Sequence, residues 1–122
     1  MVKRVDVLVD GSRTTGELVQ LGLIEPTQNL VALTSLDEVK QVLREYPCDV
    51  LYLAYDLEGG TGHDVITFLG ENPTLLPNKT VITEPYLLKR RPLEIAIHAL
   101  ELKYHRMIVC KLRDHLFQPL FA

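Results

Sequence analysis

The chain has 122 residues, of which 47% are hydrophobic and 24% are charged, and this composition predicts one globular domain with its own core. The formal net charge of −3 argues against a nucleic-acid partner, because surfaces that bind nucleic acids are normally basic. Apolar stretches in the sequence fall short of the roughly 20 residues that a membrane helix needs, so we expect no membrane partner.

The cysteines and the N-terminal residues indicate the cellular compartment in which the protein is expected. Cys48 and Cys110 are too few for a disulfide framework and lie in no metal-binding spacing, so free thiols are expected. The chain runs from Met1 directly into a strand pattern that contains Asp6, which is unlike a signal peptide. We therefore expect a cytoplasmic protein.

Predicted strands and helices alternate in the first half of the chain. Residues 5–10 are rich in β-branched side chains and end at a Gly-Ser pair, which is typical of a strand and its exit turn. A short helix is expected within residues 14–23, although two glycines weaken it. Residues 30–34 are a second strand candidate. A serine followed three residues later by a glutamate predicts a capping box for a helix over residues 36–46.

The same alternation continues in the second half. Residues 49–55 are almost continuously apolar, as in a central parallel strand that is covered on both faces. A glycine-rich turn follows, and Thr61 with Asp64 predicts the start of the next helix. Residues 79–83 form a fourth strand candidate. The order predicts an α/β fold, a doubly wound parallel sheet of four to five strands.

The C-terminal part has a different pattern. Residues 89–91 are basic, and we interpret them as a solvated loop before a helix in preference to a phosphate-binding patch. Residues 93–118 contain neither glycine nor proline, and a helix through all of them would be about 39 Å long. Such a helix either protrudes and packs on a second copy of the chain or breaks near residues 107–111, which could also form a fifth strand. We favour a helix or helix pair, with dimerisation as a consequence.

The change of pattern divides the chain into an α/β core, residues 1–88, and a helical C-terminal extension, residues 89–122. The extension is expected to pack on the core, on a second subunit, or on both. The apolar side chains of the expected stripe are Leu93, Ile97, Leu100, Tyr104, Ile108 and Leu112.

Asp10 and Asp56 are the strongest candidates for chemistry, because each follows an apolar run at the edge of the sheet where ligands of α/β proteins bind. Two such carboxylates could hold Mg²⁺ and recruit a phosphate. The alternative, which local sequence favours, is that each acid only hydrogen-bonds its own turn. Arg13 could bind an anion beside them or pair with Asp10.

Four further side chains or amides are candidates near the same edge. The turn before the predicted helix could offer the amides of Thr61 and Gly62 to an anion, although a plain turn is the preferred interpretation. His63 could act as an acid or base, or be a solvated residue. Thr83 could contact a ligand through its hydroxyl or merely end the fourth strand.

These strand-end residues resemble those of a response-regulator receiver domain, with a flavodoxin-like fold. Residues 52–69, Tyr-Leu-Ala-Tyr-Asp-Leu-Glu-Gly-Gly-Thr-Gly-His-Asp-Val-Ile-Thr-Phe-Leu, are similar to the branch called cyclic-phosphate processing receiver domains. The resemblance covers about residues 4–88. It implies an acid pair that holds Mg²⁺, histidines that move protons and a lysine after the last strand.

The chain departs from that pattern at several working positions. Gly11 stands where the second acid is expected, and Ala54 and Tyr55 replace an aspartate and a histidine. No histidine follows the fourth strand, and Lys111 is the lysine only if residues 107–110 form a strand. The resemblance therefore predicts a degenerate, non-catalytic receiver-like module, which regulates or binds proteins and needs no cofactor. The alternative is a Mg²⁺-dependent enzyme or switch acting on a phosphate or cyclic phosphate, with Asp10 and Asp56 as metal ligands.

Overall fold

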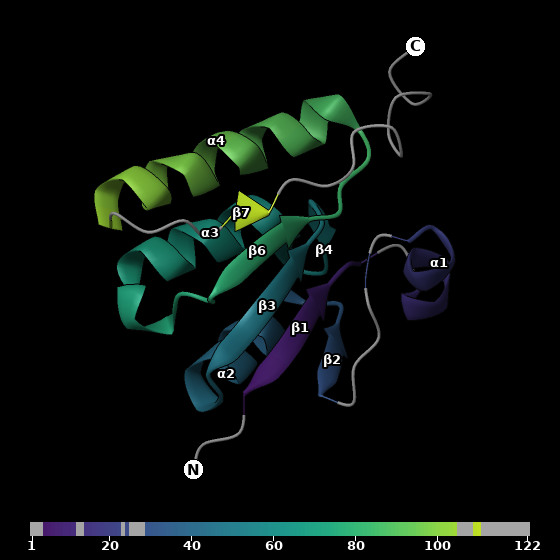
Figure 1. Ribbon diagram of the computed structural model, residues 1–122, viewed down its shortest axis with the longest axis horizontal. Helices are drawn as coiled ribbons and strands as arrows, with labels where there is room; N and C mark the ends of the chain where they lie inside the picture. Colours follow the sequence, from purple (N-terminus) through teal and green to yellow (C-terminus); the bar gives the residue numbers. More distant parts are fainter. Residues whose placement is uncertain (1–3, 12–13, 23, 25–28, 105–108, 111–122) are drawn as a thin grey trace.

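A parallel β-sheet forms the centre of the protein (Figure 1). The structure is a computed structural model, and it describes residues 4–11, 14–22, 24, 29–104 and 109–110. The strand order is β2-β1-β3-β6-β7, and all four neighbouring pairs are parallel. This order is that of the flavodoxin-like doubly wound fold, so the predicted fold class is confirmed. The strands are β1 (Val5–Val9), β2 (Leu30–Leu33), β3 (Cys48–Leu53), β6 (Lys79–Ile82) and β7 (Val109–Cys110).

Helices cover both faces of this sheet, because side chains of successive strand residues point to opposite faces. Val7 and Val9 of β1 belong to the larger core cluster, together with residues of α2, α3 and α4. Leu8 points the other way and packs with Leu18 of α1 and Val81 of β6. The helices are α1 (Thr15–Gln20), α2 (Leu36–Glu45), α3 (Gly62–Glu71) and α4 (Leu87–Tyr104), with a short 3₁₀ helix η1 (Pro73–Leu75).

A small antiparallel hairpin lies between β3 and α3. Its strands are β4 (Asp56–Leu57) and β5 (Gly60–Thr61), with Gly59 at a φ of +78° in the turn between them. Such a φ favours glycine. The predicted third strand therefore ends earlier than expected, at Leu53, and Asp56 belongs to the hairpin.

The basic residues 89–91 are helical, which corrects the loop expected there. The amides of Lys89 and Arg90 donate to the carbonyl of Tyr86 and form the first turn of α4. Pro92 lies inside the helix and has no N–H, so the carbonyl of Leu88 loses its partner four residues on. Arg90 and Leu93, which lie on either side of Pro92, are nevertheless buried in the folded protein.

The C-terminal segment contains the break that was left open as an alternative. Helix α4 ends at Tyr104, and Val109 and Cys110 pair with Thr80 and Val81 of β6 as a fifth strand. The favoured expectation of helix is therefore wrong for residues 109–110. Ile108, Lys111 and Leu112 lie outside the described residues. Among the described helices, none has both the length and the apolar character that crossing a membrane requires.

Candidate functional site

The fold brings the backbones at Asp10 and Asp56 together, as predicted from their strand ends. The amide of Gly11 donates to the carbonyl of Asp56 at 3.0 Å. The two carboxylates nevertheless lie in different surroundings, because Asp10 is buried and the side chain of Asp56 is 54% exposed. Arg13, the predicted anion-binding residue, lies outside the described residues.

The structure leaves no room for a side chain at Gly11, the position where the receiver pattern has an acid. A Cβ atom at this position would lie 2.6 Å from the carbonyl oxygen of Asp56 and 3.0 Å from Cα of Leu57. Both of these are backbone atoms, so they cannot rotate away as a side chain can. A carboxylate at position 11 therefore requires the hairpin strand β4 to move.

Asp56 already has a cation beside it. Nζ of Lys89, in the first turn of α4, lies 2.5 Å from Oδ2 of Asp56. The hydrogen bond to this carboxylate raises the pKa of Lys89 above its ordinary value. Both side chains are half-exposed, so the pair contributes little to stability, but it neutralises the acid.

Glu84 is a buried acid at the same edge that the sequence analysis did not select. It follows β6 and is 5% exposed. Its Oε1 accepts from the amide of Tyr55 at 3.0 Å, and its Oε2 accepts from the amide of Tyr86 at 3.4 Å. Glu84 therefore ties the exit of β3 to the entry of α4. Its position directly after a predicted strand was the available signal.

Thr83 is fully buried, and its amide donates to the carbonyl of Leu53 at 3.0 Å. The predicted ligand contact through its hydroxyl would therefore need the strand ends to open.

The glycine-rich turn is arranged for packing and capping. Thr61 and Asp64 form a reciprocal capping box, in which Oδ2 of Asp64 accepts from the amide of Thr61 at 2.9 Å. The amide of Gly62 donates to the carbonyl of Tyr55 at 2.7 Å. A Cβ atom on Gly62 would collide with the carbonyl of Ala54. Because a carboxylate of the chain already sits at the helix start, the anion site predicted there is not favoured.

His63 is exposed in the first turn of α3. Its carbonyl accepts from the hydroxyl of Thr67 at 3.1 Å. The structure thus agrees with the interpretation of His63 as a solvated residue.

A cavity of about 360 Å³ lies beside Asp10, between the ends of β1 and β2 and the start of α1. Among the described residues that line it, Asp10 is the only one of the predicted site residues. Asp56, Thr61, His63 and Thr83 do not contribute to it. Within this cavity, Asp10 is therefore separate from the other described candidates. The described lining residues are Leu8, Asp10, Gly11, Thr14, Thr15, Ala32, Leu33 and Thr34.

The residues present do not fit the Mg²⁺ that the receiver pattern implies. The described residues contain no group of three His, Cys, Asp or Glu side chains that could hold a metal ion. Of the two predicted ligands, Asp56 is in contact with the ammonium of Lys89. Mg²⁺ binding there would have to displace this ammonium, and Gly11 supplies no further carboxylate.

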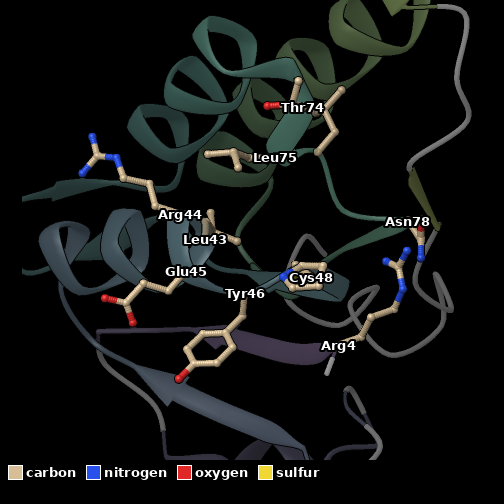
Figure 2. Close-up of a pocket in the computed structure, with 11 residues that line it drawn as sticks. Arg4, Leu43, Arg44, Glu45, Tyr46, Cys48, Thr74, Leu75 and Asn78 are labelled. Atoms are coloured by element: carbon tan, nitrogen blue, oxygen red, sulfur yellow. The ribbon is translucent and has the colours of Figure 1, made fainter. Parts of the chain in front are cut away.

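A second cavity, of about 340 Å³, lies at the opposite edge of the sheet (Figure 2). Cys48 is one of the residues that line it, and burial raises the pKa of this thiol to about 12. The thiol is therefore protonated at neutral pH and is a poor nucleophile. Figure 2 shows the side chains of Arg44, Glu45 and Tyr46 directed away from one another. Among the described residues that line this cavity, reactive side chains do not converge on one point.

Comparison of the chain with protein-family models gave no match, and comparison with curated proteins gave none.

Proposed function

We propose that the chain is a degenerate, non-catalytic receiver-like module that acts as a regulatory or protein–protein interaction domain. The contact between Lys89 and Asp56 carries this proposal, because a lysine of the chain provides the positive charge that a metal ion would otherwise provide. The closure of position 11 by the backbone of Asp56 and Leu57 supports it. The flavodoxin-like strand order is compatible with a receiver ancestry, although fold alone does not fix function.

The Mg²⁺-dependent alternative has one observation in its favour. The backbones at Asp10 and Asp56 are hydrogen-bonded neighbours through Gly11. Burial of Asp10, the ion pair of Asp56 and the exposed position of His63 outside the cavity weigh against it.

The proposed module acts through protein contacts, and we propose a cytoplasmic location for it. Cys48 is a free buried thiol, which supports a reducing compartment. The stripe that the sequence suggested as a dimer interface contains Leu93, Ile97 and Leu100, and these three pack into the core of their own chain. A partner of α4 must therefore use another face of this helix.

Thermal unfolding with and without millimolar Mg²⁺ or Mn²⁺ tests the proposal. A site whose Kd lies tenfold below the ion concentration would stabilise the folded state by about 1.4 kcal/mol. We expect no rise in Tm for the wild type. We also expect none for Asp56→Asn, which serves as the matched variant because it keeps the shape of the side chain.

The comparison is made within each variant, since Asp56→Asn also weakens the contact with Lys89. A metal-dependent rise of Tm in the wild type that disappears in Asp56→Asn would contradict the non-catalytic proposal and favour the Mg²⁺-dependent alternative.

A further inference from the structure

Helix α4 has a second apolar stripe on its exposed side. Its residues are spaced alternately by four and three positions, which is the spacing of a coiled-coil seam. Leu88 is 90% exposed, and Ile95 and Leu102 are each 64% exposed. We call this stripe the α4 seam, and it consists of Leu88, Pro92, Ile95, Ala99 and Leu102, all exposed.

The core of the chain uses the opposite side of the helix. Leu93, Ile97 and Leu100 are buried, and the hydroxyl of Tyr104 donates to the carbonyl of Gly70 in α3 at 3.0 Å. Intramolecular packing therefore accounts for one apolar side of α4 and leaves the other exposed. The seam from Leu88 to Leu102 is about 21 Å long, which is enough to pack along a second helix.

We infer that the α4 seam docks an amphipathic helix of a partner protein in which acidic side chains flank the apolar residues. This inference rests on the proposed function as an interaction module and names the chemistry of its partner. It is a helix-in-groove type of recognition, in which regularly spaced apolar side chains provide the contact and flanking charges select the partner.

The charges beside the seam give the reason for an acidic partner. The flanking positions carry Lys89 and Lys103 on one side and Arg91 and His98 on the other. Lys89 already pairs with Asp56, and His98 lies beside Glu101. Lys103 and Arg91 are therefore the charges that a partner would meet. A second copy of the chain would place like charges opposite one another at these positions, which is unfavourable. Acidic flanks on the partner would face Lys103 and Arg91 with opposite charge.

The acidic residues of α4 lie farther round the helix than the seam, and each lies near a basic side chain of the same helix. Nε of Arg90 lies 3.6 Å from Oε1 of Glu94, within α4. Oε1 of Glu101 lies 3.6 Å from Nδ1 of His98. Both glutamates are partly buried and pair with side chains of their own helix.

Binding of two synthetic helical peptides to the full-length protein tests the inference. Each peptide is about three heptads long with Leu and Ile at its seam, and the flanking positions carry Glu in one peptide and Lys in the other. Fluorescence anisotropy of the labelled peptides measures Kd at low and at physiological salt. We expect saturable binding of the Glu peptide, weakened by salt, and little binding of the Lys peptide.

Two protein variants locate the binding site. Ile95→Asp places a charge in the middle of the seam and should weaken binding of the Glu peptide by about tenfold or more. Leu21→Asp is the matched control, because Leu21 is 53% exposed but lies at the end of α1. Its Kd should equal that of the wild type. Circular dichroism checks that both variants are folded.

Three outcomes would overturn the inference. One is equal binding of both peptides or no binding of either, and another is equal Kd values for wild type and Ile95→Asp. The third is association of the protein with itself or with anionic lipid vesicles that Ile95→Asp abolishes while the Glu peptide fails to bind. In each of these cases, a Tm that does not change with Mg²⁺ or Mn²⁺ would still support the proposed function. Failure of the inference about the α4 seam can therefore be distinguished from failure of the proposed function.

Discussion

At position 11 the chain has a hydrogen atom where the receiver pattern has a side chain, and the carbonyl of Asp56 fills the space next to it. Gly11 also donates its amide to this carbonyl at 3.0 Å. Position 11 is therefore constrained by two features: its amide makes a hydrogen bond, and there is no room for a Cβ atom. The sequence showed that the acid was absent but not that the space for it was absent.

Substituting Gly11 with alanine should destabilise the fold. The added methyl would meet backbone atoms, and overpacking of this kind costs about 1–3 kcal/mol. Gly16→Ala is the control, because its Cβ would meet only Oγ1 of Thr14 at 4.0 Å, and alanine in a helix is favoured by roughly 0.5–1 kcal/mol. Urea denaturation measures both changes. A Gly11→Ala protein as stable as the wild type would show that β4 yields easily.

Single residues also show where the sequence was insufficient. The neighbouring positions of Asp10 and Asp56 could be predicted, since both follow strands that end at the same edge of one sheet. The partner of Asp56 could not, because Lys89 is 33 positions away and its segment was interpreted as a loop. Glu84 was missed for a similar reason, since its contact with Tyr55 spans 29 positions.

Among the elements, α3 agrees with its predicted start. The Thr61–Asp64 capping box could be inferred from local sequence because a cap depends on residues three positions apart. Hairpin β4–β5 was not predicted. Its two strands have two residues each, and its sequence suggested only a turn.

Removing the cap of α3 should have a measurable cost. Thr61→Ala deletes the hydroxyl that accepts from the amide of Asp64 at 3.3 Å, and such losses cost about 1 kcal/mol. Thr67→Ala is the control within the same helix, where the exposed hydroxyl only donates to a carbonyl that already lies in the helix. Chemical denaturation should rank Thr61→Ala clearly below Thr67→Ala. Equal stability of the two variants would contradict the role of the cap.

Helix α4 is the element that sequence reasoning described least well. One of its apolar stripes was identified, and three of its members are in the core. The α4 seam was overlooked because Pro92 and the basic residues before it indicated a loop. Two stripes on opposite sides of one helix also weaken the amphipathic pattern on which such interpretations depend.

For the molecule as a whole, the fold class was predictable because alternating strands and helices leave few arrangements. The boundary proposed at residue 88 falls inside helix α4. Helix α4 begins at Leu87, before this boundary, and supplies Leu93, Ile97 and Leu100 to the larger core cluster. Sequence periodicity identified these side chains but not the surface on which they pack.

A fragment of residues 1–88 should therefore fail to fold cooperatively. It lacks three core side chains of α4, and losses of single large side chains from a core already cost about 2–5 kcal/mol each. Circular dichroism in increasing urea should show a broad, non-cooperative change. Full-length Ile95→Ala is the control, since Ile95 is 64% exposed and should unfold cooperatively like the wild type. A sharp transition of the fragment would show that α4 is dispensable.

The closure at Gly11 also limits how a metal site could be engineered into this chain. A carboxylate at position 11 would require β4 to shift, and freeing Asp56 for a metal ion would require Lys89 to leave it. A single substitution would therefore not create such a site. We expect that metal binding at the strand ends needs several coordinated changes, whereas exposed residues of α4 can be exchanged one at a time.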